Sequence, residues 1–226
     1  MEKLFVENGI NIDKIKVDKF NKYYETLIFY NSQFNITAIT EKEEVYKKHF
    51  IDSILGEKYI VGKTLLDVGS GGGFPAIPLK IVKDDISLTM LEATGKKCEF
   101  LNTVKKELSL ENVLVINGRA EELAKKEGFR ESFDCVTARA VARLNILAEY
   151  CMPFVKVGGR FVSYKGDAIE EINEAKSAIE SLGGKIVEVV NYELYGAKRT
   201  IVVIEKVKNT DIKYPRSNGA IRKKPL

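Results

Sequence analysis

The sequence has few of the residues from which metal centres and disulfide frameworks are built. It contains one histidine, His49, and three widely spaced cysteines in apolar surroundings, Cys98, Cys135 and Cys151. Structural zinc sites use about four cysteine or histidine ligands at close spacing. An odd, scattered set of cysteines is typical of buried thiols in a reducing compartment. We therefore expect reduced thiols and no metal.

Long apolar runs are also missing. No segment approaches the roughly 18 apolar residues of a membrane span, and charges interrupt residues 1–19 every few positions, unlike a secretory signal. The 226 residues, 45% hydrophobic and 30% charged, suit a globular protein with one large domain or one domain and an appendage. These features predict a monomeric cytoplasmic protein with no membrane partner.

Negative charge is scarce in the last 19 residues. Residues 208–226 hold six basic side chains and one acid, Asp211, which gives +5, so the rest of the chain carries −1 of the total of +4. Such a basic C-terminal tail is suited to an acidic partner such as nucleic acid. The alternative is a solvated terminus without a partner.

Short apolar runs alternate with helical patterns after residue 63, which predicts an α/β domain over residues 63–207. Asp167 with Glu170 predicts the start of one crossover helix, and Gly183 with Gly184 its end. The last two strands have no helical pattern between them and should pair antiparallel. Residues 1–62 instead carry helical spacing over 18–34 and 41–55, which predicts an N-terminal helical cap. The seven predicted strands span residues 64–68, 87–92, 113–117, 133–138, 159–164, 186–192 and 200–207.

The stretch LDVGSGGGFP, residues 66–75, follows the first predicted strand. A dinucleotide-binding G-x-G-x-x-G loop would need glycine where Phe74 stands. The pattern is instead D-x-G-x-G-x-G, formed by Asp67, Gly69, Gly71 and Gly73. Glycines let a ligand approach the backbone, while the carboxylate favours a cation over a pyrophosphate. Together with an antiparallel last strand, this loop predicts a Rossmann-like class I methyltransferase fold that binds S-adenosylmethionine.

Two more strand ends carry candidate cofactor contacts. Glu92 ends the second strand, where a carboxylate can accept hydrogen bonds from both ribose hydroxyls. Residues 117–121, at the end of the third strand, are placed to bind the edge of adenine, and Glu121 lies among them. Taken singly, both glutamates could equally be surface acids. With Asp67 and the glycines, they favour a cofactor site.

The fourth predicted strand has no signature of the common base-methylating enzymes. It offers Thr137, Ala138, Arg139 and Ala140 rather than an Asn/Asp-Pro-Pro-aromatic motif, and Cys135 is more plausibly core than nucleophile. An atom that is already nucleophilic, such as guanine N7, needs positioning more than a base. Arg139 and Lys165 are then candidate orienting donors. His49 is either a catalytic base or a polar core residue.

Across nearly its whole length, the sequence resembles the ribosomal RNA small subunit methyltransferase G family, also called glucose-inhibited division protein B. The resemblance is carried by the loop LLDVGSGGGFPAIPLKI from Leu65 together with short motifs on either side of it. These motifs are Tyr30–Asn31, residues 35–39, His49 with Asp52–Ser53, Gly95–Lys97 with Phe100–Leu101, residues 119–122, residues 138–140 with Leu144, Lys165–Gly166 and residues 214–216.

The resemblance implies methyl transfer from S-adenosylmethionine to N7 of a guanine in the 530 loop of 16S rRNA, as naked RNA or within the small ribosomal subunit. It implies cofactor contacts at Gly69, Phe74, Ala120, Glu121 and Arg139. Substrate-side residues would be His49, Lys96, Arg119 and Lys165, of which His49 and Lys165 join Arg139 as the catalytic candidates. A small-molecule methyltransferase and a non-catalytic, cofactor-sensing RNA-binding protein are the alternatives.

Overall fold

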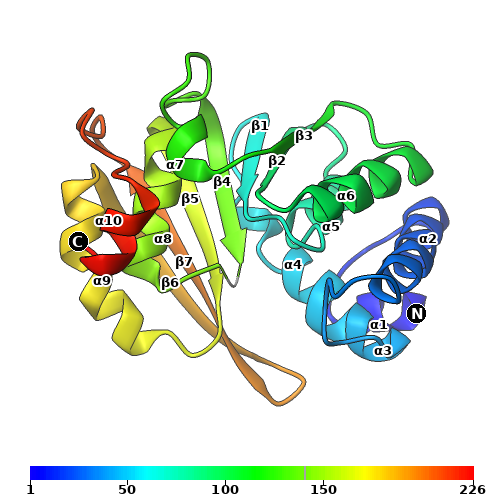
Figure 1. Ribbon diagram of the computed structural model, residues 1–226. Coiled ribbons are helices and arrows are strands. Elements are labelled where there is room, and N and C mark those ends of the chain that lie inside the picture. Colours follow the sequence, from blue (N-terminus) through cyan, green and yellow to red (C-terminus); the bar gives the residue numbers. More distant parts are fainter. Residues whose placement is uncertain (140) are drawn as a thin grey trace.

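The computed structural model describes residues 1–139 and 141–226, and its centre is one sheet of seven strands in the order β3-β2-β1-β4-β5-β7-β6 (Figure 1). The five strands from β3 to β5 pair in parallel, whereas β7 runs antiparallel to both of its neighbours. The predicted α/β class and antiparallel last strand are confirmed. The strands are β1 (Thr64–Val68), β2 (Ser87–Glu92), β3 (Val113–Asn117), β4 (Phe133–Arg139), β5 (Val155–Lys165), β6 (Gly184–Leu194) and β7 (Ala197–Lys206).

Helices cover both faces of the sheet, because strand side chains alternate between two cores. Leu65 of β1 and Cys135 of β4 face one core, while their neighbours Leu66 and Val136 face the other. The first core is covered by α5 (Ala76–Val82), α6 (Gly95–Glu107) and the N-terminal helices. The second is covered by α7 (Ala120–Leu123), α8 (Leu144–Cys151), α9 (Ile169–Ser181) and α10 (Asn218–Lys223).

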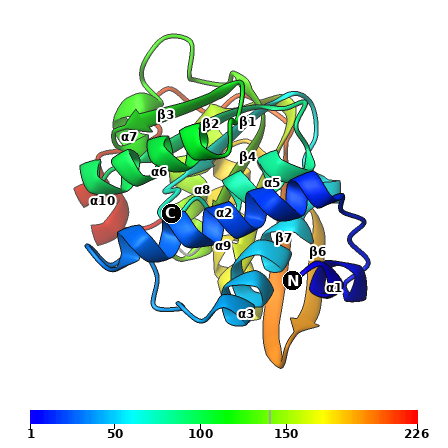
Figure 2. The same cartoon turned by 90° about the vertical axis from the view of Figure 1, so that its right-hand side faces the viewer.

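The N-terminal helices share the first core, and α2 packs against α5 and α6, which cover this face of the sheet (Figure 2). The rings of Phe20, Tyr23 and Phe50 pack in series and reach Phe74 of the glycine loop, with centroids 5.0 to 5.9 Å apart. The cap therefore supports the loop from beneath. Its elements are α1 (Glu2–Glu7), α2 (Lys14–Asn31), α3 (Lys42–Val45), the π-helix η1 (Tyr46–Ile51), α4 (Asp52–Ile54) and the 3₁₀ turn η2 (Glu57–Tyr59).

Two local predictions differ from the structure. The helix expected over 41–55 is continuous but changes pitch, since a π turn separates α3 from α4. The Asp167 cap is wrong: α9 begins at Ile169 without a side-chain cap, and the Asp167 carboxylate pairs instead with Lys198 at 3.2 Å. The predicted end is right, because α9 ends at Ser181 and Gly183 follows its C-cap Leu182 with a φ of 84°, which favours glycine.

The C-terminal segment, residues 208–226, folds back onto the sheet domain. The fully buried Lys206 ammonium donates to Thr210 Oγ1 at 2.6 Å and pairs with Glu131 at 3.1 Å, and burial lowers its pKa to about 8. Arg216 then makes a bidentate pair with the buried Glu149 carboxylate, and Ile221 of α10 is fully buried. A freely solvated terminus does not describe this segment.

Among the residues that the structure describes, no helix combines the length and apolar character needed to cross a membrane.

Replacement of Arg216 by alanine should lower the free energy of unfolding by about 3 kcal/mol, because the Glu149 carboxylate would stay buried without its partner. Urea unfolding measures this loss. Lys213→Ala is the matched control, since the Lys213–Asp211 pair is exposed to solvent. Equal midpoints for both variants would show that Arg216 does not anchor the tail.

Candidate functional site

The glycine loop lies at the carboxyl end of β1, as in open parallel sheets that bind ligands at this edge. Gly69 has a φ of 73°, and a Cβ there would lie 2.7 Å from Val141 Cγ2. Gly73 has a φ of 85°, and a Cβ there would lie 2.6 Å from the Tyr23 hydroxyl. Both positions need glycine for conformation and for space.

Glu92 closes this loop from the neighbouring strand. Its Oε2 accepts a hydrogen bond from the Gly71 amide at 2.9 Å, and its Oε1 accepts one from the Thr94 amide at 2.8 Å. The side chain is buried, so the surface-acid alternative does not hold for it. The structure therefore brings Glu92 and Gly71 together, as a shared cofactor site requires.

Asp67 lies beneath the loop and is 1% exposed. Its Oδ1 accepts a hydrogen bond from Thr137 at 2.7 Å, whereas its Oδ2 has no hydrogen-bond partner within the described chain. Burial raises the pKa of this carboxyl to about 7, against the hydrogen bond from Thr137 that lowers it. A buried acceptor without a donor is costly and points to a missing partner.

A cavity of about 110 Å³ opens beside the loop. Five residues of its wall were predicted from the sequence, namely Gly69, Gly118, Arg119, Ala120 and Glu121. Three further wall residues come from α8 and the C-terminal helix and were not predicted: Tyr150, Asn218 and Arg222.

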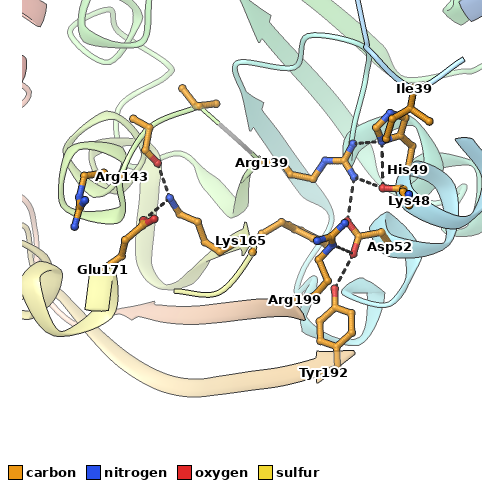
Figure 3. A pocket seen from close by; sticks show the side chains of 14 residues that line it. Ile39, Lys48, His49, Asp52, Arg139, Arg143, Lys165, Glu171, Tyr192 and Arg199 are labelled. Atoms are coloured by element: carbon orange, nitrogen blue, oxygen red, sulfur yellow. Dashed lines mark hydrogen bonds and ion pairs between the residues drawn. The ribbon is translucent and has the colours of Figure 1, made fainter. Parts of the chain in front are cut away.

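Figure 3 shows a larger cavity of about 500 Å³. Val141 lines both this cavity and the smaller one. The predicted residues His49, Arg139 and Lys165 line the larger cavity. Further basic side chains in its wall are Lys48, Arg143 and Arg199. The cavity is thus suited to anions, and it adjoins the glycine loop.

Arg139 is the centre of a buried polar network in this cavity, on the right of Figure 3. Its Nη1 contacts Asp52 Oδ2 at 3.2 Å, and its guanidinium carbon lies 5.0 Å from the centre of the Phe74 ring. The other Asp52 oxygen accepts from Tyr192 at 3.0 Å and pairs with Arg199 at 3.4 Å. Sequence reasoning assigned no role to Asp52, Tyr192 or Arg199, since nothing in their spacing shows that the cap meets β6 and β7.

His49 is held by the same network. Its Nδ1 lies 3.1 Å from Arg139 Nη2, and its Nε2 lies 2.9 Å from Thr37 Oγ1. The same Nδ1 lies 3.1 Å from the Lys48 carbonyl oxygen, which can only accept, whereas the Arg139 guanidinium can only donate, so this ring nitrogen has partners of both kinds. Burial, followed by the charge of Arg139, lowers the pKa of His49 to about 3. Its ring also stacks on Phe74 with centroids 4.5 Å apart. This geometry favours a neutral positioning residue over a catalytic base.

Lys165 lies on the opposite side of the cavity from Arg139. Its ammonium pairs with Glu171 at 2.7 Å and donates to the carbonyl of Ala142 at 2.5 Å. The side chain is only 8% exposed, so an ordinary solvent-exposed lysine is excluded. Lys165 therefore fixes the loop after β4 to the start of α9.

Other candidates lie elsewhere. Lys96 is exposed on α6 and lines neither cavity, and Arg119 is exposed at the rim of the smaller one. Cys135 is fully buried, and burial raises its pKa to about 12, which suits a core thiol. Ala140 lies outside the described residues. Within the described chain, no three histidine, cysteine or acidic side chains gather as metal ligands.

A model of the family described as rRNA small subunit methyltransferase G matches residues 16–202. Two curated proteins named Ribosomal RNA small subunit methyltransferase G are similar along nearly their full length. The one from Clostridium tetani is 47% identical over 96% of this chain and 94% of its own. The one from Caldanaerobacter subterraneus is 49% identical over 96% of this chain and 93% of its own.

Solved structures share the fold at much lower identity. A SAM dependent methyltransferase from Aquifex aeolicus has a TM-score of 0.53 and 18% identity over 71% of this chain and 93% of that chain. Precorrin-6y C5,15-methyltransferase from Geobacter metallireducens has a TM-score of 0.54 and 16% identity over 74% of this chain and 91% of that chain. This likeness confirms the predicted class I methyltransferase fold.

Asp67 and His49 should give the unfolding free energy opposite pH dependences. The raised pKa of Asp67 means that the folded state keeps a proton the unfolded state loses, so stability falls as pH rises from about 4 to 7. The lowered pKa of His49 means that stability falls as pH drops from about 6.5 to 3.

Asp67→Asn should therefore raise the free energy of unfolding by about 1–3 kcal/mol near pH 8. His49→Gln should raise the free energy of unfolding relative to the parent protein as the pH falls toward about 4. Urea unfolding at both pH values measures the two differences, and each variant is the control for the other. A pH-independent difference for Asp67→Asn would contradict the burial of its charge.

Proposed function

This chain belongs to the rRNA small subunit methyltransferase G family, and from that premise we propose how its residues carry out the reaction. It is an S-adenosylmethionine-dependent rRNA methyltransferase, and the target is N7 of a guanine in the 530 loop of 16S rRNA. The observation that carries the proposal is the junction at Val141, where a small cavity beside the glycine loop meets a larger, basic cavity.

The residues beside the glycine loop fit S-adenosylmethionine. The unpartnered Oδ2 of Asp67 offers a buried acceptor to a cation, and Glu92 offers a carboxylate already fixed at the loop. Ala120 and Glu121 line the smaller cavity, where an adenine would lie. When bound, the cofactor supplies an electrophilic methyl group on a sulfonium.

The larger cavity fits an RNA substrate. Arg199 and Lys48 bring exposed parts of basic side chains to its wall, and phosphates favour such positions. Guanine N7 carries an in-plane lone pair and no proton, so its attack needs no general base. The neutral, doubly held His49 agrees with that requirement. Arg139 acts by positioning, because Asp52 and His49 hold its guanidinium in place.

The tail cations contribute unequally to an RNA surface. Arg216 is committed to Glu149, and Lys213 pairs with Asp211, whereas Lys223 and Lys224 are exposed. We expect RNA to meet the exposed cations beside α10. We further propose that the protein acts as a cytoplasmic monomer, since a single copy of the chain supplies both cavities.

Methyl transfer tests the proposal directly. Incubation with labelled S-adenosylmethionine and small ribosomal subunits that lack the native modification should yield N7-methylguanosine at one position of the 530 loop. Nuclease digestion and mass spectrometry of the nucleosides measure it. Cofactor binding without label in the RNA would contradict the substrate and favour a small molecule or a non-catalytic role.

Arg139→Lys should lower kcat/KM for this transfer by about 100-fold, because one ammonium cannot reach Asp52, Lys48 and His49 together. Initial rates on small subunits measure the loss. Arg160→Lys is the control, since Arg160 lies on β5 outside both cavities. Equal rates for the two variants would remove Arg139 from the mechanism.

A further inference from the structure

The C-terminal helix α10 contributes to the smaller cavity, although its residues are far from the glycine loop in sequence. Asn218 and Arg222 line this cavity together with Ala120 and Glu121. α10 also lies near α7 and α8 in both ribbon views (Figures 1 and 2). The C-terminal segment, residues 208–226, thus borders the cofactor site as well as the proposed RNA surface.

The position of α10 is fixed by contacts on both sides of it. Before the helix, Arg216 pairs with the buried Glu149 of α8, and Ser217 caps the helix through the Ala220 amide. Within the helix, Ile221 is fully buried in the second core. A segment held in this way presents its polar side chains in a defined place, as a binding wall requires.

The polar atoms of the two residues leave donors available. The Tyr150 hydroxyl donates to Asn218 Oδ1 at 2.5 Å, and Arg222 Nε donates to the same oxygen at 3.2 Å. Because Arg222 can only donate, the atom facing it is the amide oxygen rather than the nitrogen. Within the described residues, the Asn218 Nδ2 and the terminal nitrogens of Arg222 make no hydrogen bond and no ion pair.

These donors match the base of an adenosine. Adenine has ring nitrogens that accept hydrogen bonds and an exocyclic amine that donates, so it suits a cavity lined by both an amide donor and the Glu121 carboxylate. A guanidinium also stacks well on a flat aromatic base. Arg222 has no carboxylate partner within the described chain, which leaves it available for that contact.

We propose that Asn218 and Arg222 form the outer wall of the adenosine end of the cofactor site, with Asn218 Nδ2 donating to the base and Arg222 covering its face. The proposal rests on the proposed function, because it takes S-adenosylmethionine as the cofactor. It assigns the C-terminal segment a part in cofactor binding in addition to any contact with RNA.

Calorimetry on the full-length protein tests it with two ligands, S-adenosylmethionine and 5′-methylthioadenosine, which keeps the adenosine but lacks the amino-acid part. Asn218→Ala and Arg222→Ala should each raise both dissociation constants about fivefold to tenfold, as expected for one lost hydrogen bond or stacking contact. Lys223→Ala removes the same charge from the next residue of α10, outside the cavity, and should leave both constants unchanged.

Asp67→Asn removes the buried carboxylate proposed to accept the cationic part of the cofactor. It should therefore weaken the binding of S-adenosylmethionine and leave the binding of 5′-methylthioadenosine unchanged. Thermal unfolding shows whether a variant keeps its fold, and Arg222, being exposed, provides the test if Asn218→Ala unfolds the helix. Unchanged constants for a folded Arg222→Ala, or an equal loss for Lys223→Ala, would overturn the inference. A parent protein that binds no S-adenosylmethionine would instead overturn the proposed function.

Discussion

The Asp52 carboxylate is the contact on which the larger cavity depends. It lies on a short helix of the N-terminal cap and joins Arg139 of β4 to Tyr192 of β6 and Arg199 of β7. Three strands and the cap are thereby fixed to one side chain. Two guanidinium groups surround one carboxylate, so the cavity keeps a net positive charge after the pairing. Removal of Asp52 would leave buried arginine charge without compensation, which is far more costly than the loss of an exposed pair.

The glycine loop is also held in place by a small number of buried polar contacts. Glu92 reaches it from the next strand, while Tyr23 donates to the Gly72 carbonyl from the cap. Asp67 is the exception, since one of its oxygens stays without a donor within the described chain. Buried polar groups that lack a partner beside a candidate site are typical of functional sites, where a ligand completes the set.

The sequence predicted the strands well, because a short apolar run bounded by turn residues fits the pattern of a buried strand better than that of a helix. The bounds of β1, β2 and β3 agree with those expected, and Gly69, Ala120 and Glu121 do line one cavity. The Asp52–Tyr192 contact joins residues 140 positions apart, a separation at which no periodicity carries information. The packing of residues 208–226 could not be predicted from the sequence either, because it depends on Glu149, an acid within the largely apolar helix α8. The Asp167 carboxylate pairs with Lys198 on β7, a partner that the local spacing of residues 167–170 does not show.

The π turn at Tyr46–Ile51 explains how one short helix serves both the cap and the cavity. Tyr46 and Phe50 are buried in the aromatic series of the cap, whereas His49 and Asp52 face Arg139. Such turns arise from one extra residue in a helix. The segment is therefore more sensitive to length than to composition: deletion of one residue there would rotate all that follows by about 100° and turn Asp52 away from both arginines.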